Sequence, residues 1–201
     1  MLLEMISYME LMERRRCLLT DSIFFDTDCI CAFLWINEES LLEKMFSGKI
    51  VIPKEVYNEI DRPTIPHLKT RIDQLIANGS AIVMSMDISS EEYALYRELT
   101  TDSGRNKVIG RGEAASISLA KKHHGVLGSN NLRDVSYYIN KYSLKNVTTG
   151  DILVEAFQKG LITEQEGNTI WTNMLNKKRK IGANSFTEFL QRSKIDNSKY
   201  N

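Results

Sequence analysis

The chain has 201 residues, of which 42% are hydrophobic and 26% are charged. These proportions are typical of a soluble globular chain with one core and argue against a disordered or collagen-like chain. The 26 basic residues balance the 26 acidic ones, which argues against a protein that coats nucleic acid by bulk charge.

The predicted elements alternate between short buried strands and helices. Leu2, Ile6, Met9 and Met12 recur at helical spacing and predict an amphipathic helix over residues 2–19, which either packs on the main domain or binds a partner. Short apolar runs predict buried strands at residues 23–25, 49–52, 81–84, 125–128 and 147–149. Helical patterns cover residues 29–35, 40–46, 53–60, 67–78, a segment opening at 89, 113–122, 132–142, 152–157, 164–175 and 185–190. We expect a polar loop over residues 101–110 and fraying after Arg192.

Strands that alternate with helices pair in parallel through crossover connections. We therefore predict an α/β fold with an open parallel sheet of four to five strands, helices on both faces and extra helices at both termini. We divide the chain into an N-terminal helical extension (1–21), a main domain (22–160) and a C-terminal helical extension (161–201).

Acidic side chains follow the strands of this predicted sheet, at the edge where open parallel sheets bind their ligands. Carboxylates gathered at one edge repel each other, and a divalent cation such as Mg²⁺ or Mn²⁺, which prefers oxygen ligands, relieves that repulsion. A single acid at a helix N-terminus also has a structural explanation, since it gains about 0.3–1 kcal/mol there. The group as a whole is stronger evidence than any one member. It comprises the acids Asp26, Asp28, Glu59, Glu113 and Asp134 and the amide Asn131.

Four segments resemble, in order, the motifs of PIN-domain nucleases. Residues 23–27 are similar to the family's opening strand, which ends in Asp followed by Thr or Ser, and residues 51–60 resemble its second motif, whose last Glu is a metal-site acid. Residues 112–117 resemble the third motif, and residues 127–134 resemble the fourth, which in many VapC-type toxins reads Thr-x-Asn-x-x-acid. The segment from Gly160 onward is similar to the tail of a PIN branch often found beside antitoxin genes. The resemblance covers about residues 22 to 192 and implies that the main domain is a PIN-like nuclease domain.

The resemblance implies a metal-dependent ribonuclease in which one or two Mg²⁺ or Mn²⁺ ions lower the pKa of a bound water and stabilise charge on the scissile phosphate. In-line attack would leave a 5′-phosphate and a 3′-hydroxyl. The implied catalytic and metal-binding acids are Asp26, Glu59, Glu113 and Asp134, with Asn131 as a further ligand. Thr27 and Ser129 would position ligands or waters. The implied contacts to the RNA backbone are Arg105, Lys107, Arg111 and Arg133.

Asn131 departs from the family pattern, because many PIN proteins have Asp at this position. An amide oxygen can bind a metal but brings no charge, and Asp134 supplies the missing charge in Asn-containing variants. The departure keeps open a second hypothesis, a catalytically decayed PIN-like module that binds RNA or protein without cutting. A third hypothesis comes from residues 26–28, which are also similar to the Asp-x-Asp opening of haloacid-dehalogenase-type phosphatases.

The expected partners are an RNA substrate, an antitoxin protein and a second copy of the chain. The basic run over residues 177–180 either contacts phosphates or is a solvated turn. Cys17, Cys29 and Cys31 show no CxxC spacing, which predicts a reducing, cytoplasmic setting. No run approaches the roughly 20 apolar residues that span a bilayer, so we expect no membrane partner.

Overall fold

The structure is a computed structural model and describes residues 21–101 and 108–198. The predicted helix over residues 2–19 lies outside this part of the chain, as do Cys17 and the candidate RNA contacts Arg105 and Lys107. Over the two described ranges, no helix is both long enough and apolar enough to cross a membrane.

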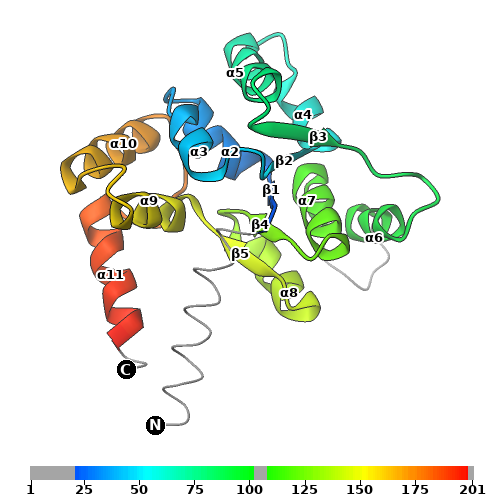
Figure 1. The fold of residues 1–201 in the computed structure, drawn as a ribbon. Coiled ribbons are helices and arrows are strands. Elements are labelled where there is room, and N and C mark those ends of the chain that lie inside the picture. Colours follow the sequence, from blue (N-terminus) through cyan, green and yellow to red (C-terminus); the bar gives the residue numbers. More distant parts are fainter. Residues whose placement is uncertain (1–20, 102–107, 199–201) are drawn as a thin grey trace.

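A parallel five-stranded sheet lies at the centre of the described residues, with the strand order β3-β2-β1-β4-β5 (Figure 1). The strands are β1 (Ile23–Phe25), β2 (Ile50–Pro53), β3 (Ala81–Met84), β4 (Val126–Gly128) and β5 (Lys145–Val147). In the register of the sheet, Phe24 of β1 lies between Val51 of β2 and Leu127 of β4. The chain builds the sheet outward from β1 on one side and then returns to build the other side. Strand order therefore reverses between β1 and β4, and open α/β sheets bind ligands beyond the carboxyl ends of the strands at such a point.

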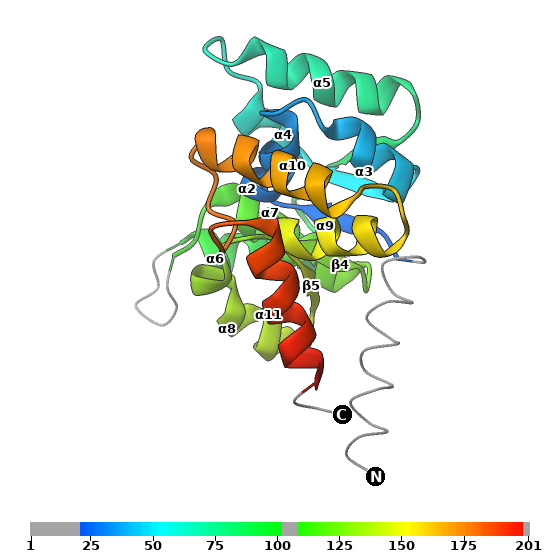
Figure 2. The same cartoon turned by 90° about the vertical axis from the view of Figure 1, so that its left-hand side faces the viewer.

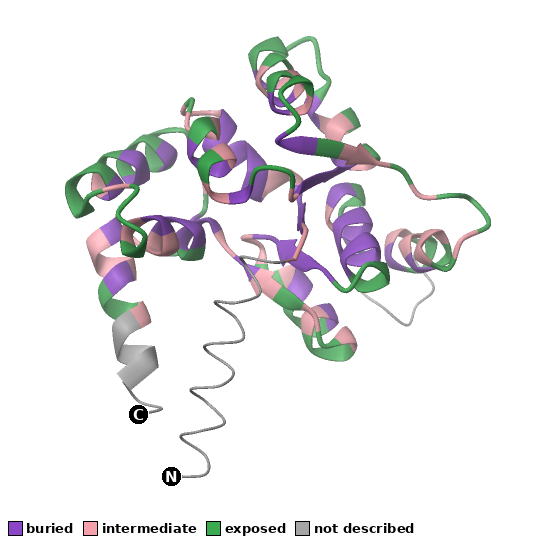
Figure 3. Ribbon diagram, viewed as in Figure 1, coloured by how far each residue is buried: buried purple, intermediate pink, exposed green. Residues whose placement is uncertain are grey.

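Helices cover both faces of the sheet, as Figure 1 shows. They are α2 (Thr27–Leu34), α3 (Glu39–Phe46), α4 (Lys54–Ile60), α5 (Pro66–Ala77), α6 (Glu91–Thr100), α7 (Arg111–Lys122), α8 (Leu132–Tyr142), α9 (Thr149–Gln158), α10 (Glu164–Asn176) and α11 (Phe186–Ser198). Because side chains alternate along a strand, Ile23 and Phe25 join a core with α2, α3, α9, α10 and α11, whereas Phe24 joins a second core with α6, α7 and α8. Figure 3 shows buried residues along the strands and the inward sides of these helices. The predicted α/β fold is confirmed.

The element boundaries differ from the predicted ones in a few places. Strand β5 lies two residues earlier than predicted, because the Thr148 hydroxyl accepts a hydrogen bond from the Asp151 amide and so begins α9. Pro53 ends β2 instead of opening the next helix. Helix α7 begins at Arg111, two residues before the predicted start, and α11 continues to Ser198, past the point where fraying was expected.

The C-terminal helices α10 and α11 pack on the same core as the sheet (Figure 2). Trp171 is fully buried there, and its indole Nε1 donates a hydrogen bond to the Ala183 carbonyl oxygen at 3.0 Å. The ring of Phe186 lies against Gly167, where a Cβ atom would come within 2.4 Å of it. The proposed domain boundaries at residues 22, 160 and 161 stay a prediction.

Candidate active site

Asp26 lies at the carboxyl end of β1 and caps helix α2. Its Oδ1 accepts a hydrogen bond from the Cys29 amide at 2.7 Å, while Oδ2 is buried and has no hydrogen-bond partner among the described residues. The residue is 1% exposed. Burial raises the pKa of Asp26 to about 7, the Ser129 hydroxyl and the Cys29 amide lower it, and the charges of Asp28 and Glu113 raise it. This environment disfavours a charged carboxylate unless a cation balances it.

Glu59 reaches from the last turn of α4 to the first turns of two other helices. The Thr27 hydroxyl donates to Glu59 Oε2 at 2.5 Å, and the Gly112 amide donates to Glu59 Oε1 at 3.0 Å. A Cβ atom on Gly112 would lie 2.5 Å from Thr27 Oγ1 and 3.1 Å from Glu59 Oε2. Only glycine at position 112 lets α7 approach closely enough to hold Glu59 in this way.

Asn131 bridges the two remaining acids. Its Nδ2 donates to Glu113 Oε1 at 2.6 Å and to Asp134 Oδ2 at 2.8 Å. Both partners are carboxylates, which accept hydrogen bonds when ionised, so the amide nitrogen must face them. The Asn131 nitrogen thus holds Glu113 and Asp134 together. The expected binding of a metal by the Asn131 oxygen stays a prediction.

The described residues contain no group of three or more Asp, Glu, His or Cys side chains that converge as metal ligands. Two of the acids do not converge because their oxygens already accept hydrogen bonds. Both oxygens of Glu59 do so, and so do both oxygens of Glu113, the second from the Gly110 amide at 3.2 Å. The chemistry of the donor set nevertheless fits a hard divalent cation, since its members are carboxylate oxygens and the buried Oδ2 of Asp26 has no hydrogen-bond partner. To bind a cation, Glu59 and Glu113 would have to exchange some of these donors for it.

The other predicted site residues lie around this cluster. Ser129 is fully buried directly after β4, and its Oγ accepts a hydrogen bond from the Asn131 amide at 3.3 Å. Arg111 and Arg133 are exposed in the first turns of α7 and α8. The structure thus gathers Asp26, the three other acids, Thr27, Ser129 and Asn131 at one edge of the sheet.

The sequence did not predict two residues, Ser116 and Asn130, that hydrogen-bond to the elements around the site. The Ser116 hydroxyl lies 2.9 Å from the carbonyl oxygens of both Phe25 and Gly112 and ties α7 to the end of β1. Asn130 holds the first residue of α9, because its side chain donates to Thr149 Oγ1 and accepts from the Thr149 amide, both at 2.8 Å. Ser116 could have been found from the sequence, because it is a polar residue on an otherwise apolar face of its helix.

The basic run over residues 177–180 returns to the edge of the site. Arg179 Nη1 donates to Asp28 Oδ1 at 3.3 Å, in the first turn of α2. Lys177 Nζ lies 5.8 Å from the ring centroid of Trp35. The run therefore joins the turn after α10 to helix α2, which neither of the two sequence-based alternatives described.

The family model DUF3368, described as a PIN domain, matches residues 22–194. The matched range includes all five strands and each acid of the candidate site. No curated protein matches the chain.

Proposed function

Because the chain belongs to the PIN-domain family, whose members are generally nucleases, we propose that it is a metal-dependent endoribonuclease. The observation that supports this most is Asp26. A buried carboxylate with an unpartnered oxygen stands at the carboxyl end of the central strand, and the Glu113 carboxylate is close enough for its charge to raise the pKa of Asp26. Such an arrangement costs stability unless it serves a ligand.

In this proposal Asp26, Glu59, Glu113 and Asp134 hold one or two Mg²⁺ or Mn²⁺ ions. When bound, the metal supplies Lewis-acid stabilisation of phosphate charge and an acidified water. Thr27 and Gly112 orient Glu59, and Asn131 holds Glu113 and Asp134 in place. Arg111 and Arg133, exposed at the ends of α7 and α8 nearest the acids, contact RNA phosphates.

We further propose a cytoplasmic toxin whose partners are an antitoxin protein and a second copy of the chain. The support is the likeness of residues 127–134 and of the segment from Gly160 onward to VapC-type toxins. Cys29 and Cys31 are both buried free thiols, which suits a reducing compartment. Purification of the natural complex, followed by identification of its components, tests this proposal.

One observation favours a second candidate function, an RNA- or protein-binding module that does not cut. Asn131 donates hydrogen bonds where many PIN proteins place a further acid, and the described residues hold no preformed metal-ligand group. The phosphatase hypothesis is not carried further, because the chain belongs to the PIN-domain family.

Cleavage of a mixed panel of structured RNAs in Mn²⁺ or Mg²⁺, against EDTA, tests the nuclease proposal. Asp26→Asn should lower the cleavage rate by at least about 100-fold, the loss typical when an electrostatic contact to reacting charge is removed. Asp61→Asn is the matched control, since Asp61 is an exposed acid two residues beyond Glu59, and it should cut at the parent rate. Absence of cutting together with absence of Mn²⁺ binding by calorimetry would overturn the nuclease and favour the binding module.

A further inference from the structure

Helix α8 carries an exposed stripe of basic and aromatic side chains, made of Arg133, Tyr137 and Lys141. The three residues follow at intervals of four and therefore share one side of the helix. Tyr137 is 59% exposed, whereas the neighbouring Val135 and Tyr138 are buried in the core with α6 and α7. The core accounts for Tyr138 but does not account for the large exposed ring beside it.

Neighbouring side chains contact the Tyr137 ring and leave it exposed to solvent. The ring of Tyr138 meets it edge-on, with centroids 5.1 Å apart and an interplanar angle of 80°. Lys141 Nζ lies 5.8 Å from the Tyr137 centroid. A held aromatic ring that is open to solvent and has a cation beside it is the kind of surface on which unpaired bases stack.

The stripe is continuous with the candidate active site. Helix α8 begins one residue after Asn131, so Arg133 stands beside the Asn131–Asp134 pair. From there the stripe extends for eight residues, which is about 12 Å along a helix. A strand bound at the acids and extending over α8 would meet a cation, a ring and a second cation in that order.

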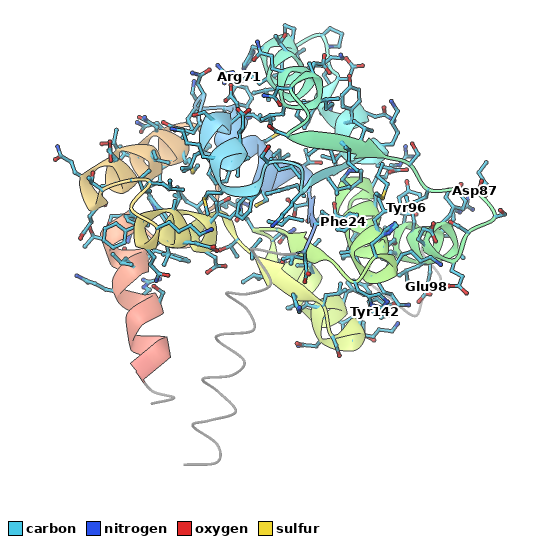
Figure 4. All side chains as sticks on the ribbon, viewed as in Figure 1. Phe24, Arg71, Asp87, Tyr96, Glu98 and Tyr142 are labelled. Carbon is cyan, nitrogen blue, oxygen red and sulfur yellow. The ribbon has the colours of Figure 1, made fainter. Side chains whose placement is uncertain are left out.

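The charges around Lys141, at the end of the stripe away from the acids, still allow an anion to bind. Lys121 Nζ lies 4.5 Å from the ring centroid of Tyr142, so a further cation stands close by. Glu98 of α6 pairs with Lys141 at 3.7 Å across the surface; Figure 4 labels Glu98 and Tyr142 in this part of the molecule. An exposed pair of this kind contributes little stability, so an RNA phosphate can replace the Glu98 carboxylate.

We propose that this stripe is a binding track for single-stranded RNA, in which Tyr137 stacks on a base while Arg133 and Lys141 contact phosphates. The inference rests on the proposed nuclease function and deepens it, because stacking on an exposed ring requires an unpaired base. The new assignment is that Arg133, Tyr137 and Lys141 hold the strand beyond the acids.

Equilibrium binding of a fluorescent twelve-nucleotide oligouridylate or oligoadenylate to the full-length Asp26→Asn protein tests the track without cleavage. Adding Tyr137→Ala should weaken binding about tenfold, within the range for one stacked base, while Tyr137→Phe should bind like the parent. Tyr93→Ala, which removes a half-buried ring from α6, is the matched control and should leave affinity unchanged. Lys141→Gln should lower the slope of log affinity against log salt by about one. A blunt RNA duplex should bind equally well with and without Tyr137.

The outcomes separate this inference from the function on which it rests. If Tyr137→Ala is folded by circular dichroism and binds the oligonucleotides as tightly as the parent, the track is wrong while the nuclease proposal stands. If Tyr137→Ala instead abolishes self-association in sedimentation and leaves RNA affinity unchanged, the surface is a protein interface and the track is again overturned. If the Asp26→Asn protein binds neither oligonucleotide, the track is overturned, and cleavage by the parent protein alone decides the nuclease proposal.

Discussion

Two helical glycines allow close contacts of opposite character in two regions of the molecule. A Cβ atom on Gly167 would lie 2.4 Å from the Phe186 ring, in the apolar core beneath α10 and α11. A Cβ atom on Gly112 would lie 2.5 Å from the Thr27 hydroxyl, at the acidic edge of the sheet. The same steric allowance admits an aromatic ring in one region and a hydrogen-bonded carboxylate, that of Glu59, in the other.

The apolar core stabilises the fold, whereas the hydrogen bonds at the acidic edge position the side chains of the candidate site. Contacts in the apolar core are numerous and non-directional, so they contribute mainly to the free energy of unfolding. The acidic edge instead buries Asp26 with one oxygen unpartnered, and the nearby charges of Asp28 and Glu113 disfavour its ionised form, which opposes folding in the absence of a cation. Substitutions in the first region should therefore change stability, and substitutions in the second should change function and pH dependence.

The largest expected effect is on stability, from Trp171→Ala in the core. Trp171 is fully buried, and its indole donates to the Ala183 carbonyl, so truncation leaves a cavity and an unpaired carbonyl. We expect a loss of about 3–5 kcal/mol in the free energy of unfolding, measured with urea. Leu175→Ala, at a more exposed position of the same helix, should cost far less. Equal losses from the two variants would contradict the assignment of stability to this core.

Asp26→Asn should change the pH dependence of stability in the metal-free protein. The pKa of Asp26 is raised to about 7 in the folded state from 3.8, so its favourable contribution is complete below about pH 4 and is lost as pH rises to about 7. The loss amounts to at most about 4 kcal/mol, from the free energy per pKa unit. Asparagine does not titrate, so the variant should gain stability relative to the parent between pH 4 and pH 8. Parallel stability curves would contradict a buried, protonated Asp26, and Asp61→Asn serves as the control.

The strands and acids were predictable because each depends on short stretches of sequence. Apolar runs such as residues 23–25 are buried whatever packs on them, and Asp26 directly follows one of these runs. The shift of β5 shows the limit of that reasoning. Thr148 follows an apolar residue and favours a strand by its β-branched shape, yet its hydroxyl caps α9 and ends the strand.

The contacts that shape the site were not predictable, because they join segments far apart in the chain. Gly112 meets Glu59 across 53 positions, and Arg179 meets Asp28 across 151. The direction of the Asn131 amide depends on where the Glu113 carboxylate lies, and that is a property of how α7 packs beside α8. Sequence gives the residue types at the edge of the sheet and leaves their mutual hydrogen bonds open.

Asn131→Asp should convert a donor at the acidic edge into a further carboxylate. The variant loses hydrogen bonds to Glu113 and Asp134 and adds a like charge between them, so we expect the metal-free protein to lose about 1–3 kcal/mol of stability. Mn²⁺ should bind more tightly than to the parent and restore that stability, as calorimetry and thermal melts would measure. Asn140→Asp, at an exposed position of the same helix, is the control. Weaker Mn²⁺ binding by Asn131→Asp would contradict the proposed metal site.

Gly112→Ala should lower cleavage about tenfold or more with a smaller change in stability, because the added methyl displaces Thr27 or Glu59 and disturbs only the edge. Gly110→Ala is the matched control, since its added Cβ would meet only the Glu113 side chain, at 3.4 Å or more. If Gly112→Ala lost as much stability as Trp171→Ala and its cleavage per folded molecule were unchanged, Gly112 would serve the fold and not the site.

The smallest expected effect belongs to Lys178, in the turn that links the two regions. Its φ of 58° lies in the left-handed region just after α10, where glycine avoids the clash of a Cβ atom. Lys178→Gly should therefore stabilise the protein by about 1 kcal/mol in urea unfolding. Cleavage should stay unchanged, because the Arg179 ion pair with Asp28 uses the neighbouring side chain. A fall in cleavage by folded Lys178→Gly protein would instead mean that the conformation of this turn is transmitted through Arg179 to the acidic edge.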